Sequence, residues 1–193
     1  MIAAVVLAAG ASTRFGSQKL LAPLGGAPLV RRTVERVLAA AGVGDVVVVV
    51  GHEGDAVRDA LAGLPVRVVA SPDYRLGMSS SLHAGVRALA PGTAAALIAL
   101  GDQPTVTPAI IDALITEWRH TERPIVAPVY AGTRGNPVLF AAPLFPELLA
   151  VHGDVGARDV IARSPTRVAT VAFDFPMPRD VDGVGDLEGL RDA

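Results

Sequence analysis

The chain contains no cysteine among its 193 residues. A disulfide framework, a thiolate nucleophile and a cysteine-ligated zinc or iron–sulfur site are therefore excluded. Aromatic residues are also scarce, at 4%, whereas hydrophobic residues make up 51% of the chain. With alanine and valine prominent among them, this composition excludes a disordered chain and favours a single α/β domain with a core of small side chains.

The chain also has no large excess of positive or negative charge and no long apolar run. The net charge is −2 and the isoelectric point is about 6.1, which leaves no electrostatic footprint for a nucleic acid. The longest apolar runs have the length of strands, well short of a membrane span. No basic segment precedes the first of them, as it would in a secretory signal peptide. We therefore predict a cytoplasmic protein that binds neither nucleic acid nor a membrane.

Apolar runs alternate with helix-like segments along the chain. The five valines at 46–50 show no period-two alternation, which is typical of a strand buried on both faces of a parallel sheet. The alternation predicts an α/β fold of three layers, with a mostly parallel central sheet and helices on both faces. We predict strands over 3–7, 46–50, 66–70, 95–100, 125–129 and 168–172, and helices over 28–41, 55–62, 79–89, 108–118 and 157–162.

The chain is predicted to be one domain over 1–193 that has two functional halves. Residues 1–107 alternate regularly between strand and helix, whereas residues 108–193 are richer in proline, glycine and arginine. This change suits a nucleotide-binding half followed by an acceptor-binding half. In such sheets, ligands bind beyond the carboxyl ends of the strands, so the segments that follow each strand are the ones to search for chemistry.

The loop after the first strand is rich in glycine and serine and carries Gly10, Arg14 and Lys19. Its backbone N–H groups and its two cations suit a polyphosphate. The loop matches neither the phosphate-binding pattern Gly-x4-Gly-Lys-Ser/Thr nor the dinucleotide pattern Gly-x-Gly-x-x-Gly. The alternative is an ordinary turn between strand and helix with surface cations.

Carboxylates occur at two further places. Asp102 follows the buried run at 95–100 and is held between a glycine and the sequence Gln-Pro, where it could hold a divalent cation on a phosphate. A turn or capping role is the alternative. Asp180 and Asp182 would point to the same side of an extended segment, so one of them could be a second metal ligand, unless they belong to a solvated acidic tail.

Three polar segments complete the candidate set. Ser79, Ser80 and Ser81 open a predicted helix, where hydroxyl and N–H groups can bind a base edge, a ribose or a phosphate; simple N-capping is the alternative. Two glycine-containing turns carry Arg134 and Arg158. Each arginine could bind phosphate, although an ordinary loop explains either one equally well.

As an ordered set, these segments resemble the molybdenum cofactor nucleotidyltransferases, and most closely the cytidylyltransferases among them. The pair Ala8-Ala9 looks like the cytidylyl type, because the guanylyl relatives more often have Ala-Gly-Gly here. At position 136 there is an asparagine where many relatives have histidine, and the segment after Asp182 lacks their Thr-Pro. The matching segments are 7–16 with 19–21, 77–82, 101–104, 134–138, 153–158, and 180–182 with 186–188.

The resemblance implies a nucleotidyltransferase fold and a Mg²⁺-dependent transfer of CMP from CTP to the phosphate of molybdopterin or its molybdenum form, with release of pyrophosphate. A molybdoenzyme or its chaperone would be a further partner. The implied catalytic residues are Arg14, Lys19 and Asp102, and the implied metal ligands are Asp102 and Asp182. The implied nucleotide contacts are Ala8, Ala9, Gly10, Arg14, Lys19, Ser79, Ser80 and Asp102, and the implied acceptor contacts are Arg134, Gly135, Asn136 and Arg158.

The chemistry of this reaction fits the residues independently of the resemblance. A phosphate monoester is mostly dianionic at neutral pH and attacks without a general base. Catalysis then requires in-line positioning and neutralisation of charge on the phosphates, which a lysine, an arginine and a carboxylate-held Mg²⁺ supply. The chain has no cysteine, serine or histidine nucleophile constellation, which agrees with direct displacement.

Other functions remain open at this point. Within the same class, the enzyme could use GTP or could charge a sugar 1-phosphate. Some relatives of the superfamily have been assigned as oxidoreductases, which would imply a nicotinamide or flavin cofactor. A third alternative is a non-catalytic chaperone that binds the finished cofactor.

Overall fold

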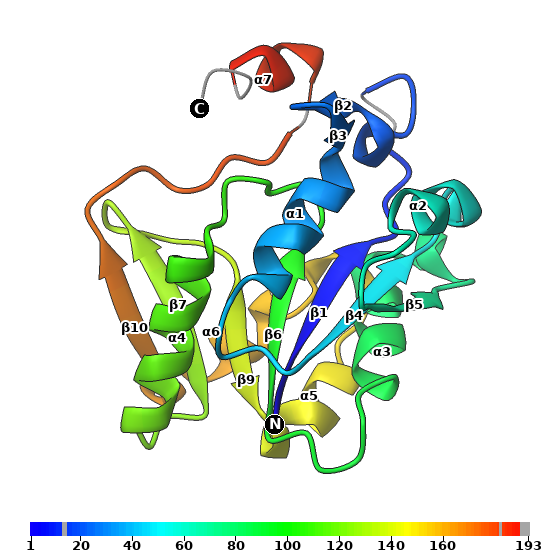
Figure 1. Ribbon diagram of the computed structural model, residues 1–193. Helices are drawn as coiled ribbons and strands as arrows, with labels where there is room; N and C mark the ends of the chain where they lie inside the picture. The colour runs from blue at the N-terminus through cyan, green and yellow to red at the C-terminus, as the bar shows by residue number, and fades with distance from the viewer. Residues whose placement is uncertain (13–14, 182, 190–193) are drawn as a thin grey trace.

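The computed structural model describes residues 1–12, 15–181 and 183–189 (Figure 1). Within these ranges, eight strands form one sheet in the order β10–β7–β9–β6–β1–β4–β5, and β8 pairs with β7. A separate hairpin joins β2 (Pro23–Leu24) to β3 (Ala27–Pro28). The strands of the main sheet are β1 (Ile2–Ala8), β4 (Asp45–Val50), β5 (Arg67–Ala70), β6 (Ala95–Leu100), β7 (Ile125–Tyr130), β8 (Thr133–Arg134), β9 (Val138–Ala141) and β10 (Val168–Phe173).

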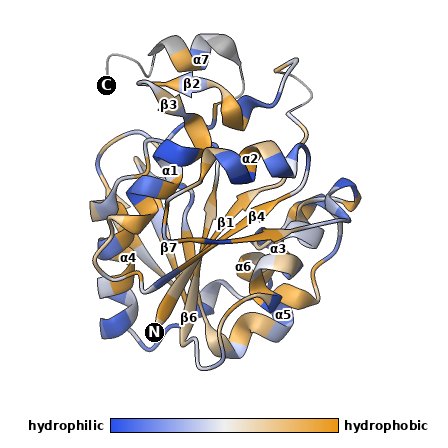
Figure 2. Ribbon diagram, turned by 45° about the vertical axis from the view of Figure 1, so that its right-hand side comes forward, coloured by the Kyte–Doolittle hydropathy of each residue, from blue (hydrophilic) through white to orange (hydrophobic). Residues whose placement is uncertain are grey.

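The centre of the sheet is parallel and buried on both faces. Strand β1 pairs in parallel with β4 on one side and with β6 on the other, and all five valines at 46–50 are at most 2% exposed. Alternate residues of β1 enter different cores: Val5 packs in one hydrophobic cluster and Val6 in the other. Figure 2 shows these apolar strands between the helices. The prediction from the valine run is confirmed.

Helices cover both faces, so the three-layer α/β architecture is confirmed. Helices α1 (Leu29–Leu38), α2 (Gly54–Ala60) and α4 (Pro108–His120) contribute to the cluster that contains Val6. Helices α3 (Met78–Arg87), α5 (Phe145–Leu149) and α6 (Arg158–Arg163) contribute to the cluster that contains Val5. A last helix, α7, spans Val184–Gly189. In the described part of the chain, no helix combines the length and the apolar character needed to cross a membrane.

The main difference from the predicted fold is β9, which the sequence pattern missed. This strand lies between β6 and β7 and runs antiparallel to both. It has only four residues, three of them almost fully buried, so it shows neither the length nor the alternation by which a strand is recognised. The predicted helix at 28–41 is also shorter in the structure, because α1 ends at Leu38.

The two predicted halves share one sheet. Strands β9, β7 and β10, all from residues 108–193, extend the sheet beyond β6 at its edge. The division into a nucleotide-binding and an acceptor-binding half stays a prediction.

Helix α3 packs closely on the sheet at Gly85. A Cβ atom added there would overlap Val5 Cγ1 and lie 3.0 Å from Val49 Cγ2. We expect Gly85→Ala to lower the stability, because overpacking a core costs about 1–3 kcal/mol, more than the gain of about 1 kcal/mol that alanine brings to a helix interior. Thermal unfolding followed by circular dichroism measures the change.

Gly185 of α7 provides the matched control for this prediction, since a Cβ atom added there meets nothing within 4 Å. Gly185→Ala should be neutral or slightly stabilising. An unfolding midpoint for Gly85→Ala at or above that of the wild type would contradict the packing argument.

Candidate active site

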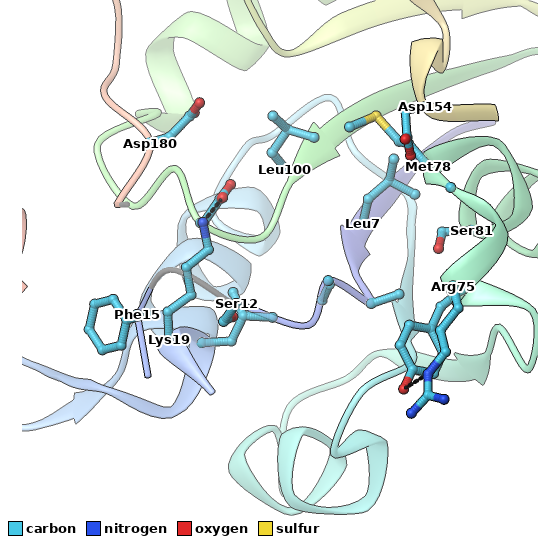
Figure 3. Close-up of a pocket in the computed structure, with 17 residues that line it drawn as sticks. Leu7, Ser12, Phe15, Lys19, Arg75, Met78, Ser81, Leu100, Asp154 and Asp180 are labelled. Carbon is cyan, nitrogen blue, oxygen red and sulfur yellow. Dashed lines mark hydrogen bonds and ion pairs between the residues drawn. The ribbon is translucent and has the colours of Figure 1, made fainter. Parts of the chain in front are cut away.

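A pocket of about 490 Å³ lies beyond the carboxyl ends of β1 and β6 (Figure 3). The chain builds β4 and β5 on one side of β1 and then returns to build β6 on its other side. This reversal creates the type of crevice in which open α/β sheets bind ligands. Leu7, the penultimate residue of β1, stands opposite Leu100, the last residue of β6, and both line the pocket.

The predicted cation and the predicted carboxylate meet in this pocket. Lys19 begins a short 3₁₀ helix, η1 (Lys19–Leu21), and Asp102 lies in the turn after β6. Their side chains form an ion pair with 2.6 Å between Nζ and Oδ2 and are 16% and 19% exposed. Lys19 is also the single lysine of the chain. The pair therefore presents a reachable positive charge and a reachable carboxylate at the same point.

A second carboxylate, Asp180, lines the same pocket. The buried side chain of Gln103 donates a hydrogen bond from Nε2 to Asp180 Oδ1 at 2.6 Å. The next residue, Val181, is fully buried and donates its N–H to the Asp102 carbonyl at 3.1 Å. The late segment is thereby tied to the turn that carries Asp102. Asp182, the predicted metal ligand, lies outside the described residues, as does Arg14.

The other end of the pocket is bounded by the start of α3. Among the predicted nucleotide contacts, Ala8, Ala9 and Gly10 line the pocket. Of the three serines, Ser81 lines it; Ser79 and Ser80 are not among its lining residues. The Ser80 hydroxyl donates to the Gly77 carbonyl at 2.8 Å. Gly77 itself occupies the N-cap position without a side-chain hydrogen bond, so N-capping by a serine is wrong.

Three lining residues at this end did not emerge from the sequence: Tyr74, Arg75 and Asp154. The Arg75 guanidinium lies 5.6 Å from the centre of the Tyr74 ring, and its Nε donates to the Tyr74 hydroxyl at 3.2 Å. In Figure 3, Arg75 and Asp154 lie across the pocket from Lys19 and Asp180. Tyr74 and Arg75 come from a segment that matches no pattern, whereas Asp154 lies in the matching segment 153–158, where Arg158 is the predicted contact. Only the fold brings the two segments together.

The predicted acceptor residues lie away from these walls. None of Arg134, Gly135, Asn136 and Arg158 is among the residues that line the pocket in the described part of the chain. Arg134 is exposed on β8, and Arg158 is exposed at the first position of α6. The Asn136 carbonyl accepts a 2.8 Å hydrogen bond from the buried Tyr130. Burial raises the pKa of the Tyr130 hydroxyl above its ordinary value.

The donor set of the pocket suits a metal that arrives with a nucleotide. Across the described ranges, His, Cys, Asp and Glu side chains form no group of three or more that could hold a metal by themselves. The pocket does hold the carboxylates of Asp102 and Asp180. Mg²⁺ is commonly bound by one or two carboxylates together with substrate phosphates, so these residues fit that mode of binding.

Comparison with known proteins shows to which family the chain is similar. The model of the MobA-like NTP transferase domain matches residues 4–169. The chain is 34% identical over 127 residues to the bifunctional protein GlmU of Geotalea daltonii, covering 65% of this chain and 27% of that protein. It is 33% identical over 199 residues to nicotine blue oxidoreductase of Paenarthrobacter nicotinovorans, covering 98% and 96%. The chain thus spans about a quarter of the length of GlmU and nearly all of the oxidoreductase.

Three solved structures superpose on this chain over its whole length. Rv0371c of Mycobacterium tuberculosis H37Rv superposes with a TM-score of 0.90 at 31% identity, covering 100% of this chain and 97% of that one. A structure of the same protein in complex with manganese gives 0.85 at 30% identity, with 100% and 98% covered. A nucleotidyl transferase from Methanothermobacter, Mth528, gives 0.84 at 30% identity, with 100% and 96% covered.

Proposed function

The chain belongs to the family of MobA-like NTP transferase domains, and we propose that it transfers CMP from CTP to the phosphate of molybdopterin or its molybdenum form, releasing pyrophosphate. The observation that carries this proposal is the ion pair of Lys19 and Asp102 at the crevice between β1 and β6. A lysine beside a carboxylate at this place suits a triphosphate and the cation that accompanies it.

In this proposal, Lys19 binds the phosphates that leave as pyrophosphate, with Arg14 as the second cation of the loop and the N–H groups beside Gly10 as donors. The positive charge of Lys19 gains importance as negative charge develops on the leaving group. An acceptor phosphate that is already dianionic needs only to be held in line. We assign that task to the predicted acceptor contacts Arg134, Gly135, Asn136 and Arg158, although they do not line the pocket that holds Lys19 and Asp102. A molybdoenzyme or its chaperone would then receive the product.

Asp102 is the proposed ligand of Mg²⁺, with Asp182 as the second ligand. When bound, the metal would neutralise charge on the phosphates and on the leaving pyrophosphate. Asp180, which lines the pocket next to this turn, is the alternative second ligand. The manganese complex of Rv0371c, a protein similar along its whole length, supports the use of a divalent cation.

The cytosine is proposed to lie between Ala8-Ala9 and the start of α3. Ala8 and Ala9 are 1% and 4% exposed and line the pocket. The backbone of Gly51 packs closely on Ala9: a Cβ atom added there would lie 2.7 Å from the Ala9 carbonyl oxygen and 2.8 Å from Ala9 Cβ. Methyl groups at this wall would narrow the space for a base, which favours a pyrimidine over the larger purine.

We expect Ala9→Gly to relax selectivity toward GTP while leaving CTP turnover largely intact. Shape discrimination by a methyl-sized difference is worth about 10–200-fold, so part of the preference for CTP should be lost. Competition assays with equal concentrations of CTP and GTP measure the ratio. Ala3→Gly, the same change at the fully buried far end of β1, should leave the ratio unaltered. A wild-type enzyme that prefers GTP would contradict the cytidylyl assignment.

The direct test of the function is an assay of pyrophosphate release. Purified protein is incubated with Mg²⁺ and molybdopterin, and with each of the four common ribonucleoside triphosphates in turn. We expect release with CTP that depends on both the metal and the acceptor. Release only with a sugar 1-phosphate as acceptor would keep the nucleotidyl chemistry and replace the substrate.

An oxidoreductase is the second candidate, because a relative that matches nearly the full chain bears that name. Its chemistry would require a redox cofactor, and the first loop of this chain lacks the Gly-x-Gly-x-x-Gly pattern of dinucleotide binding. The absorption spectrum of the purified protein, together with reduction assays using nicotinamide cofactors, distinguishes the two candidates.

A further inference from the structure

The first loop, of which the structure describes residues 9–12 and 15–19, is organised by a buried side chain that does not line the pocket. Gln18 is only 4% exposed, although it immediately precedes Lys19. Burial of an amide is unfavourable unless its hydrogen bonds are made. The contacts of Gln18 therefore show what the loop gains from it.

The oxygen and the nitrogen of the Gln18 side-chain amide each make two hydrogen bonds. Oε1 accepts from the Ser12 hydroxyl at 2.8 Å and from the Leu20 N–H at 3.4 Å. Nε2 donates to the Gly10 carbonyl at 3.3 Å and to the His52 carbonyl at 2.9 Å. Two donors and an acceptor with two lone pairs are all that such a side chain offers. One side chain thereby joins both ends of the first loop to the backbone that follows β4.

These bonds fix the backbone at both ends of the loop. A trans peptide is planar, so a Gly10 carbonyl held toward Gln18 directs the next N–H, that of Ala11, the opposite way. At the other end, the Leu20 N–H is held at the start of η1, which fixes the backbone from which Lys19 reaches Asp102. A further bond, from the His52 N–H to the Ala9 carbonyl at 3.2 Å, closes the same junction.

We propose that Gln18 is a positioning residue that preorganises the first loop for a triphosphate. This inference rests on the proposed function, since it takes the loop to be the phosphate site. Donors that are already in place when the ligand arrives bind it without the loss of loop entropy that a mobile loop would incur. Gln18 acts through the loop backbone and makes no contact with the phosphates itself.

The test measures binding, so that it does not depend on turnover. Inorganic tripolyphosphate with Mg²⁺, and separately CTP with Mg²⁺, are titrated into the whole chain by calorimetry. Gln18→Met keeps the length of the side chain and removes all four bonds. Gln18→Asn keeps the amide but is one bond shorter, so it cannot reach every partner at once. We expect the Kd for both ligands to rise about tenfold or more in Gln18→Met and by less in Gln18→Asn.

A variant with a slightly destabilised core controls for a general loss of stability. Ile111→Val removes one buried methyl group from α4, and its Kd should stay at the wild-type value. Amide hydrogen exchange of the first loop should accelerate in the Gln18 variants and not in this control. In the steady-state assay, the loss should appear in KM for CTP more than in kcat.

The possible results separate the inference from the function on which it rests. If the wild type binds neither ligand, the proposed function fails. If the wild type binds and folded Gln18→Met or Gln18→Asn binds equally well, the positioning role is wrong. If Gln18→Met does not fold, Gln18→Asn decides the question by the same two measurements.

Discussion

Replacing Lys19 with alanine is expected to lower kcat/KM by about 10²–10³-fold, the loss observed when a single preorganised group that stabilises transition-state charge is removed. Lys19 lies in the pocket within 2.6 Å of Asp102, and no other lysine in the chain can substitute for it. The pair is largely buried, so removal of Lys19 leaves the Asp102 carboxylate without its partner and should cost some stability. The cost should stay moderate, because both side chains line the pocket, where water can solvate the carboxylate. Steady-state kinetics with CTP and the acceptor, together with thermal unfolding, measure both effects.

Two variants sharpen this prediction. Lys19→Arg keeps the charge and should recover part of the activity. Arg119→Ala removes an exposed cation from the last turn of α4, away from the pocket, and should leave kcat/KM unchanged. A value for Lys19→Ala within about threefold of the wild type corresponds to less than about 1 kcal/mol of barrier, and the triphosphate role of Lys19 would then be wrong.

Asp102→Asn is expected to abolish the response to Mg²⁺ and to reduce activity by at least about 10²-fold, since metal neutralisation of phosphate charge is worth several kcal/mol. Asparagine has nearly the same shape but lacks the charge that holds a divalent cation. The fold should survive. Mn²⁺ binding in the presence of CTP, followed by electron paramagnetic resonance, gives a readout that is independent of turnover. Normal activity and a normal metal titration would refute the assignment.

The same measurements on Asp180→Asn and Asp182→Asn identify the second carboxylate. The larger loss is expected at Asp182, the position that matches the family motif. A larger loss at Asp180 would move the role to the carboxylate that Gln103 holds at the pocket.

The sequence predicted the scaffold, and it predicted Lys19 and Asp102 as parts of one site, because both predictions depend on short-range signals. A run of apolar residues followed by a polar loop marks the carboxyl end of a buried strand, and parallel strands place such ends at one edge of the sheet. Lys19 and Asp102, 83 residues apart, could therefore be expected to meet. Strand β9 could not be predicted, because four buried residues carry no periodicity.

Two features could not be predicted from the sequence: which side chains of a helix face the pocket, and which distant loops come together at it. Consecutive residues of a helix point about 100° apart, so of three adjacent serines only some can face one cavity, and the sequence does not reveal which. Ser81 does so in the structure, where Ser79 and Ser80 had been expected. Arg75 and Asp154 line the pocket from separate loops, and neither loop has a pattern that reveals its neighbour.

The single lysine makes the pocket accessible to spectroscopy. Reductive methylation with isotope-labelled formaldehyde modifies primary amines and keeps their charge, and this chain offers two: Lys19 and the amino terminus. Strand β1 (Figure 1) lies between them in the chain: Met1 is exposed before its first residue, and Lys19 begins η1 after its last. An NMR spectrum of the modified protein therefore contains one methyl resonance from the pocket and one from a remote internal reference, so occupancy of the site can be followed without any engineered label.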